Sequence, residues 1–495
     1  MKKIIGLVII LAVLIVGSYY VTGLITERTL KKDINIINQS NGLFVDIQQY
    51  DRGWFTSTAQ LKWQMHIPER VVKTDNGQTK TVPAQDYTLD MPLKIYHGPV
   101  MIADTVRFGL GYAYTKLTLP ETYYEQFGQY FTAESTKPEL KISVLVNYFN
   151  KSHFRVNVLP FKLITKEDNA QFEWLGMISD VAISSNLKNV DGEFTIEGLI
   201  FHKDDTTARL GQVSSDYEMS QTKSGLYIGE ASLNFPSFEI AEKENIIFDL
   251  KKLYLHTSSD IEDGLFSSYF KASLDKIVAN GKTYGPGRLE MSIKNLDAEV
   301  MAKINEQVNK LQDGSDQERQ QALLALAPDL PKLFAKGAEF SISELSFTMP
   351  EGVLKGNLLF SLPKGESDNP FQLIQKVEGD GKLRIPAEVL RQVLVKSAKE
   401  KLMQQPDLPG TESAGDAKKE QIAEGDVVAE ESADKQVTVA EIEQKAKQQT
   451  DQKLENLVQS GVLQKKEDAY IIEMKLANGQ LLINGKPFNM DMFKF

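Results

Sequence analysis

Residues 58–67 read TAQLKWQMHI, and this stretch decides the class of fold. Apolar and polar residues alternate over its ten positions, and the apolar set is Ala59, Leu61, Trp63, Met65 and Ile67. Successive side chains of a β-strand point to opposite faces of a sheet, so a period of two predicts a strand. We expect one face of this strand to be buried and the other to be solvated.

The same alternation recurs along the chain and predicts a sheet of many strands. It appears at residues 106–114, 140–148 and 289–293. Residue pairs that favour tight hairpin turns separate the alternating segments, namely Asn76-Gly77, Asp191-Gly192, Asp263-Gly264 and Asn280-Gly281. Strands do not alternate with long helices, so a doubly wound parallel fold is disfavoured.

The predicted fold class is α+β, with a large, mainly antiparallel β-rich domain over residues 43–404. Helical spacing of apolar residues places covering helices near residues 297–336 and 386–404. Residues 405–437 are rich in small and charged residues, which predicts a disordered acidic linker. Residues 438–495 predict a C-terminal helix and a β-hairpin that pack on the main domain.

The amino-terminal segment is apolar, and residues 4–25 contain no charged side chain. At ~1.5 Å per residue such a helix spans about 33 Å, enough to cross a hydrocarbon core of ~30 Å. An uncleaved transmembrane signal anchor competes here with a cleaved signal peptide, and the length of the run favours the anchor. Residues 1–3 then form a cytoplasmic tail, and residues 26–42 form a juxtamembrane segment.

Composition limits the possible chemistry. The chain of 495 residues has a net charge of −11 and no cysteine. A dedicated nucleic-acid binder is therefore disfavoured, and disulfides, thiolate metal sites and cysteine nucleophiles are excluded. No nucleophile elbow, phosphate-binding loop or zinc pattern occurs. The sequence thus predicts no catalytic residue, no metal site and no cofactor, and it favours a non-enzyme.

Three residues are candidates for a binding role: Tyr50, Arg52 and His97. His97, in the triplet His-Gly-Pro, is either a base or ligand that titrates near neutral pH, or a turn residue that bonds the backbone. Arg52 pairs with a carboxylate or a lipid head group in one interpretation. In the other, Tyr50, Arg52 and Gly53 fix a bulge or the entry to a hairpin.

Several short motifs together resemble the YdgA-like proteins, a bacterial inner-membrane family with a domain of unknown function. The motifs are Tyr20–Gly23 (YVTG), Tyr50–Ser57 (YDRGWFTS), His97–Pro99 (HGP), Gly285–Leu289 (GPGRL) and Ala477–Gly485 (ANGQLLING). Their order agrees with the family from residue 20 to residue 488. The resemblance implies a cytoplasmic tail, one membrane helix and a large periplasmic domain, and it implies no established reaction.

These observations predict a single-pass protein of the bacterial inner membrane, anchored through residues 4–25, with its large C-terminal domain in the periplasm. Lack of cysteine suits an oxidising compartment. The expected function is non-enzymatic binding or scaffolding in the envelope, with a lipidic or protein partner. A membrane-tethered hydrolase that uses distant carboxylates is the alternative. A continuous apolar groove would favour binding, and a deep polar pocket with paired carboxylates would favour the hydrolase.

Overall fold

The computed structural model describes residues 2–38, 43–67, 70–73, 79–119, 124–310, 329–365, 375–403 and 439–488. The chain divides into two compact units, Met1–Glu339 with Pro363–Pro370 and Phe340–Leu362 with Phe371–Phe495. The predicted domain of residues 43–404 is thus divided between the two units. The predicted acidic linker, residues 405–437, lies outside the described residues.

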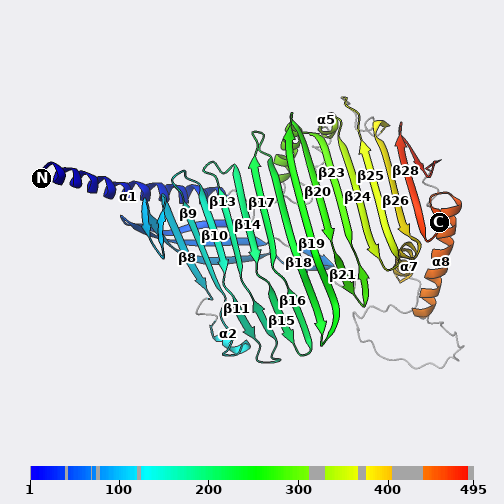
Figure 1. The fold of residues 1–495 in the computed structure, drawn as a ribbon, viewed down its shortest axis with the longest axis horizontal. Helices are drawn as coiled ribbons and strands as arrows, with labels where there is room; N and C mark the ends of the chain where they lie inside the picture. The colour runs from blue at the N-terminus through cyan, green and yellow to red at the C-terminus, as the bar shows by residue number, and fades with distance from the viewer. Residues whose placement is uncertain are drawn as a thin grey trace, which may run out of the picture. The chain divides into compact units, whose positions relative to one another are not determined.

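Antiparallel strands dominate both units, which confirms the predicted β-rich fold (Figure 1). The first unit contains β1 Leu43–Arg52, β2 Thr56–Ile67, β3 Arg70–Lys73, β4 Thr79–Val82, β5 Gln85–His97, β6 Val100–Ile102, β7 Val106–Phe108, β8 Gly111–Thr118, β9 Glu139–Val146, β10 Ser152–Val158, β11 Phe161–Ile164, β12 Gln171–Trp174, β13 Met177–Ile183, β14 Asn189–Ile196, β15 Leu199–Lys203, β16 Thr206–Leu210, β17 Val213–Gln221, β18 Tyr227–Glu242, β19 Asn245–Glu262, β20 Leu265–Leu274, β21 Lys276–Ala279, β22 Lys282–Tyr284 and β23 Gly287–Asp297. Its helices are α1 Lys2–Ile37, α2 Tyr124–Tyr130, α3 Ala298–Lys310 and α5 Leu330–Phe334.

The second unit combines a small sheet with two long helices. Its elements are β24 Glu339–Met349, β25 Gly352–Ser361, β26 Glu378–Pro386, α7 Ala387–Met403, α8 Val439–Gln459, β27 Gln464–Lys466, β28 Ala469–Ala477, β29 Gln480–Ile483 and β30 Lys486–Pro487. Arg391 of α7 donates two hydrogen bonds of 2.9 Å to the Asp451 carboxylate of α8. Leu454 and Leu457 of α8 are buried in a cluster that includes Leu390 of α7. The apolar stripe of each helix therefore packs within this unit.

Helix α1 is continuous through the predicted anchor and most of the predicted juxtamembrane segment, residues 26–42. The Lys31 ammonium lies 2.7 Å from the Glu27 carboxylate one turn earlier, a spacing that favours helix across the charged region. Asn38, next to the end of the helix, exchanges two hydrogen bonds between its side-chain amide and the backbone of Val45 in β1. Helix and first strand are thus tied together directly.

The carboxyl-terminal part of the predicted membrane anchor packs against protein. Tyr19 and Thr22 donate hydrogen bonds to backbone carbonyls of the sheet region. Among the residues that the structure describes, no helix is long and apolar enough to cross a membrane. This finding contradicts the predicted localisation as a single-pass inner-membrane protein with a periplasmic domain, and the predicted signal anchor has no support.

A long antiparallel sheet forms most of the first unit. Its strands lie in the order β9, β10, β13, β14, β17, β18, β19, β20 and β23, each bonded to the next (Figure 1). The predicted strand at residues 140–148 is β9. The prediction for residues 106–114 was one strand, whereas the structure has β7 and β8 separated at Gly109 and Leu110. The backbone N–H of Leu110 turns to bond Val146 O, which interrupts the alternation.

Eight successive strand lines of this sheet are irregular at one level, which we call the crease. Six lines are interrupted between strands, at Pro160, Gly176, Gly198, Gly211, Asp275 and Gly285, whereas β18 and β19 run through and leave Pro236 and Lys252 out of their ladder. Proline lacks the N–H that a ladder needs, and Gly198 has φ +126° with Leu210 O only 2.5 Å from where a Cβ would lie. Backbone hydrogen bonds join neighbouring interruptions, for example Glu197 N–H to Gly176 O.

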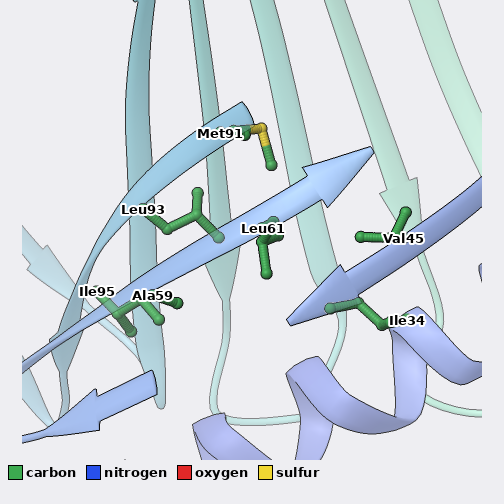
Figure 2. Packing of buried hydrophobic residues seen from close by; sticks show 7 residues of the cluster. All are labelled: Ile34, Val45, Ala59, Leu61, Met91, Leu93 and Ile95. Atoms are coloured by element: carbon green, nitrogen blue, oxygen red, sulfur yellow. The ribbon is translucent and has the colours of Figure 1, made fainter. Parts of the chain in front are cut away.

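A second layer, made of β1, β2 and β5, crosses one face of the long sheet near the end of α1 (Figure 2). The predicted strand at residues 58–67 is the central strand of this layer, β2. Buried residues from the helix and all three strands form one cluster, consisting of Ile34, Val45, Ala59, Leu61, Met91, Leu93 and Ile95. Ile142 of β9 packs against this cluster, so the two layers share an apolar interior.

Candidate functional site

A groove opens where β5 leaves the long sheet. β5 pairs with β2 along its whole length, but it pairs with β8 only from Lys94–Tyr114 to His97–Gly111. β8 in turn pairs fully with β9. Because β5 and β8 diverge beyond these four pairs, the two layers separate and leave space between their apolar faces.

The groove has a volume of about 630 Å³, within the range of roughly 300–1,000 Å³ that small-molecule sites occupy. Its walls come from α1, β2, β5, β8, β9 and β10, and the lining residues are Thr26, Thr29, Leu30, Ile34, Leu61, Trp63, Met65, Tyr87, Thr88, Leu89, Met91, Leu93, Ile95, Gly111, Ala113, Ile142, Val144, Val146, Phe154 and Val156. No charged residue lines it. A groove with such walls suits hydrocarbon and disfavours a charged substrate.

Exposure locates the open end of the groove. Met65, Tyr87 and Leu89 line the groove and are 44%, 50% and 45% exposed. On the neighbouring pair of residues, His66 Nδ1 and Asp86 Oδ1 lie 2.7 Å apart, and they belong to the opposite face of this layer. The groove therefore runs from an apolar interior to a solvent-exposed mouth at Met65, Tyr87 and Leu89.

Helix α1 closes the other end through three side chains on one face. Tyr19 Oη donates to Val100 O at 2.6 Å, and Thr22 Oγ1 donates to Gly98 O at 2.6 Å. One turn later Thr26 Oγ1 donates to Thr22 O and lies 3.3 Å from Leu110 O. The spacing of three and four residues puts these groups in a line along the helix. They hold α1 against the loops that follow β5 and precede β8.

Two glycines permit this close contact. A Cβ on Gly23 would lie 2.6 Å from His97 Nδ1, and a Cβ on Gly111 would lie 2.5 Å from Thr26 Oγ1. Both distances are far below the carbon contact distance of ~3.5–4.0 Å. Any larger residue at either position would push the helix away from the sheet.

His97 lies at the centre of this closed end and is 1% exposed. Its Nδ1 lies 3.0 Å from Trp54 O, and its Nε2 lies 2.8 Å from Ser57 Oγ. A carbonyl oxygen only accepts, so Nδ1 carries the proton and Nε2 accepts from the Ser57 hydroxyl. Burial lowers the pKa of the imidazole below its ordinary value, which keeps the ring neutral.

The pair of Ser57 and His97 has the spacing of a nucleophile and its base, but it lacks access. Ser57 is 2% exposed, and α1 covers the imidazole at Gly23. A serine nucleophile must reach the carbonyl carbon of a substrate, and the burial of Ser57 closes off that approach. The pair positions the helix and the strand ends.

Arg52 and Tyr50 lie on the flank of the same closed end. Arg52 Nη1 donates to Glu27 Oε2 at 3.1 Å, and its guanidinium lies 5.2 Å from the centre of the Tyr20 ring. The hydrogen bond from Lys31, more than the Arg52 charge, holds the pKa of Glu27 below its usual range. Tyr50 packs on the buried cluster between the layers, and burial raises the pKa of its phenol.

The structure thus brings the three candidate residues together at the closed end of the groove, and none of them lines it. The sequence analysis missed the groove itself. Its signal was present in β5, where Leu89, Met91, Leu93 and Ile95 alternate with polar residues. This alternation does not show that β5 separates from β8 after four residue pairs.

Carboxylates gather elsewhere, on the polar face of the long sheet. A shallow hollow there is lined by Asp180, Asp191, Glu193, Asp216, Glu218 and Glu230. Asp180 is paired with Arg155 at 2.7 Å, and Asp191 with Lys151 at 3.0 Å. Within the described ranges, no group of three or more histidines and carboxylates is arranged to hold a metal ion. The hollow is shallow, whereas the alternative function of a hydrolase calls for a deep polar pocket with paired carboxylates.

Comparison with known proteins gives one match. The model of a bacterial protein family of unknown function, DUF945, matches residues 1–491. No curated protein and no solved structure matches the chain.

Proposed function

The chain belongs to the DUF945 family of bacterial proteins of unknown function, and we propose that it is a non-enzymatic protein that binds the acyl chain of a lipid in its groove. The observation that carries the proposal is the groove of about 630 Å³ without a charged lining residue. Within the family, we propose that the chain belongs to the YdgA-like group, because its motifs at residues 20–23, 50–57 and 97–99 resemble that group.

Burial of hydrocarbon is the main source of affinity in this proposal. Each methylene that leaves water contributes about 0.8 kcal/mol, so a chain of several methylenes outweighs the loss of its own freedom. The wall residues offer no charged partner, so a charged group inside the groove would lose its hydration without an opposite charge to replace it. A long apolar chain is therefore the chemistry that this groove accepts best.

The mouth suits the polar end of the same ligand. Met65, Tyr87 and Leu89 line the mouth, and each of them is about half exposed to solvent. A head group at this position keeps its contact with water while the chain enters the groove. The closed end at His97 is too far inside the protein to meet a head group, which is consistent with a positioning role for that residue.

The test compares two tryptophan variants in a fluorescent fatty-acid displacement assay. Ile142 lines the groove, whereas Ile246 is 48% exposed at the start of β19 and outside it. We expect Ile142→Trp to fill the groove and raise the Kd at least about tenfold, equivalent to ~1.4 kcal/mol. Ile246→Trp makes the same replacement and should bind as the unaltered protein does.

Unaltered folding of both variants is checked by circular dichroism and thermal melting. Equal affinity of the two variants, or a lack of fatty-acid binding by the unaltered chain, would refute the proposed function. Mass spectrometry of lipids that copurify with the full chain then identifies the natural ligand.

A further inference from the structure

The apolar wall of the groove continues as one row of residues across the long sheet. Residues that pair directly on neighbouring antiparallel strands project to the same face. Starting from Ile142, the paired residues on nine strands form what we call the apolar row: Ile142, Val156, Ser179, Phe194, Ser215, Leu233, Leu255, Ala272 and Leu289. Seven of these nine residues are apolar, and Ser215 donates its hydroxyl proton to the backbone oxygen of Ser232.

The next position on each strand gives the opposite composition. We call it the polar row, and it contains Ser143, Arg155, Asp180, Glu193, Asp216, Ser232, His256, Lys271 and Glu290. Members of this row bond one another, as Arg155 does with Asp180 and Lys271 with Glu290. The sheet therefore has one solvated face and one apolar face over all nine strands.

The apolar row is not packed as a protein core would be. Each of its nine members is only partly buried, whereas Leu61 and Ile95 between the two layers are 2% and 1% exposed. Side chains in a packed interior lose nearly all contact with water. The described side chains of the first unit thus leave this face incompletely covered.

The row is continuous with the groove, and it is longer than one lipid chain. Ile142 and Val156 belong to the groove lining and are the first two members of the row. Nine strands make eight steps of about 4.8 Å, so the row extends over roughly 38 Å. A bilayer core of ~30 Å contains two chain lengths end to end, so one acyl chain fills less than half of the row.

We infer that the apolar row continues the groove as a binding surface for lipid chains, and that the ligand is a lipid with two or more acyl chains. This inference rests on the proposed function and names the class of its ligand. A free fatty acid would fill the groove and leave most of the row in water. A lipid with several chains covers both, and its hydrocarbon supplies the contacts that the protein lacks.

Single-cysteine labelling tests the inference, because the full chain contains no cysteine. Ile142→Cys reports on the groove, and Phe194→Cys and Leu255→Cys report on the distal part of the row. His256→Cys is the matched control on the polar face, one residue away from Leu255. Each variant is labelled with a maleimide alone, with oleate, and with dioleoylphosphatidylcholine supplied as small vesicles.

We expect the phospholipid to protect all three apolar positions and oleate to protect Ile142→Cys alone. At free lipid of about ten times Kd, labelling of an occupied site slows roughly tenfold. His256→Cys should label at one rate throughout. Protection of Ile142→Cys without protection of the two distal cysteines would overturn the inference and leave the proposed function standing.

Two further outcomes also decide the matter. If neither lipid protects Ile142→Cys, the proposed function fails and the inference fails with it. The second outcome concerns protein concentration. If the labelling rate of the distal cysteines falls as the protein concentration rises and does not respond to lipid, a second copy of the chain covers the row and the inference is overturned. Cysteine is small enough to leave the fold intact at these partly buried sites, and melting temperatures check this for each variant.

Discussion

The same substitution at two positions of α1 is expected to change stability in opposite directions. Gly17 has no neighbouring atom within 4 Å of its would-be Cβ, whereas that of Gly23 would lie 2.6 Å from His97 Nδ1 and 2.7 Å from its Cε1. Alanine gains about 1 kcal/mol over glycine in a helix interior. Gly17→Ala should therefore stabilise the protein by up to that amount.

At Gly23 this gain is outweighed by the contact with His97. The imidazole must move by about 1 Å to reach an ordinary contact distance, and it is fixed by hydrogen bonds to Ser57 Oγ and Trp54 O. Loss of such a bond with a buried partner left unsatisfied costs about 1–3 kcal/mol. Two disturbed bonds cost about 2–6 kcal/mol, so after subtraction of the helical gain of about 1 kcal/mol we expect Gly23→Ala to destabilise the protein by about 1–5 kcal/mol.

Hydrogen exchange of the full chain, followed by mass spectrometry, is the assay of choice. It resolves α1 from the second unit, whose independent unfolding would complicate a single denaturation curve. We expect faster exchange in residues 19–37 for Gly23→Ala and slower exchange for Gly17→Ala. If both variants slow exchange equally, the contact between α1 and His97 does not form as described.

Two further predictions concern pH and chain length. Burial lowers the pKa of His97 below its value of 6.5 in the unfolded chain. The unfolded state therefore binds more protons than the folded state as the pH falls. The stability that neutral His97 supports above pH 6.5 is lost as the pH falls below 6.5. His97→Gln should remove this part of the decline in urea midpoint between about pH 7.5 and 5.5; an unchanged decline would show that other groups cause it. From composition alone, deletion of residues 408–434 should leave the melting temperature nearly unchanged; a large decrease would show that the segment contributes to the packed structure.

Local strand formation was predictable because it depends on local alternation. The segment at residues 58–67 forms β2 and the segment at residues 140–148 forms β9, as expected. The separation of β7 from β8 was not predictable, because it depends on the bond from Leu110 N–H to Val146 O, a residue 36 positions away. Alternation determines which residues share a face but not which distant strand covers it.

The incorrect membrane prediction has a comparable cause. Tyr19, Thr22 and Gly23 are uncharged, so they extend the apparent apolar run. In the structure the first two donate hydrogen bonds to the sheet region, and the third allows contact with His97. A window that sums hydropathy does not distinguish a residue in contact with lipid from one that faces a protein backbone.

The motifs around Tyr50, Arg52 and His97 were recognised separately, and their convergence became visible only in three dimensions. The turn between β1 and β2 supplies Trp54 O, the start of β2 supplies Ser57, and the end of β5 supplies His97. Residues 20–23 of α1 lie against both. Because the four-pair junction of β5 with β8 depends on long-range pairing, sequence spacing alone did not place these motifs in one site.

The crease has a consequence for how this chain tolerates changes in length. An insertion of one residue inside a strand exchanges its two faces, which would place residues of the polar row against the groove. Leu159–Pro160, Leu175–Gly176 and Gly211–Gln212 lie between strands, so an added residue there lengthens an existing interruption and preserves the alternation on both sides. Insertions and deletions among homologous chains are therefore expected to accumulate along this line across the sheet, while the strands on either side keep constant lengths.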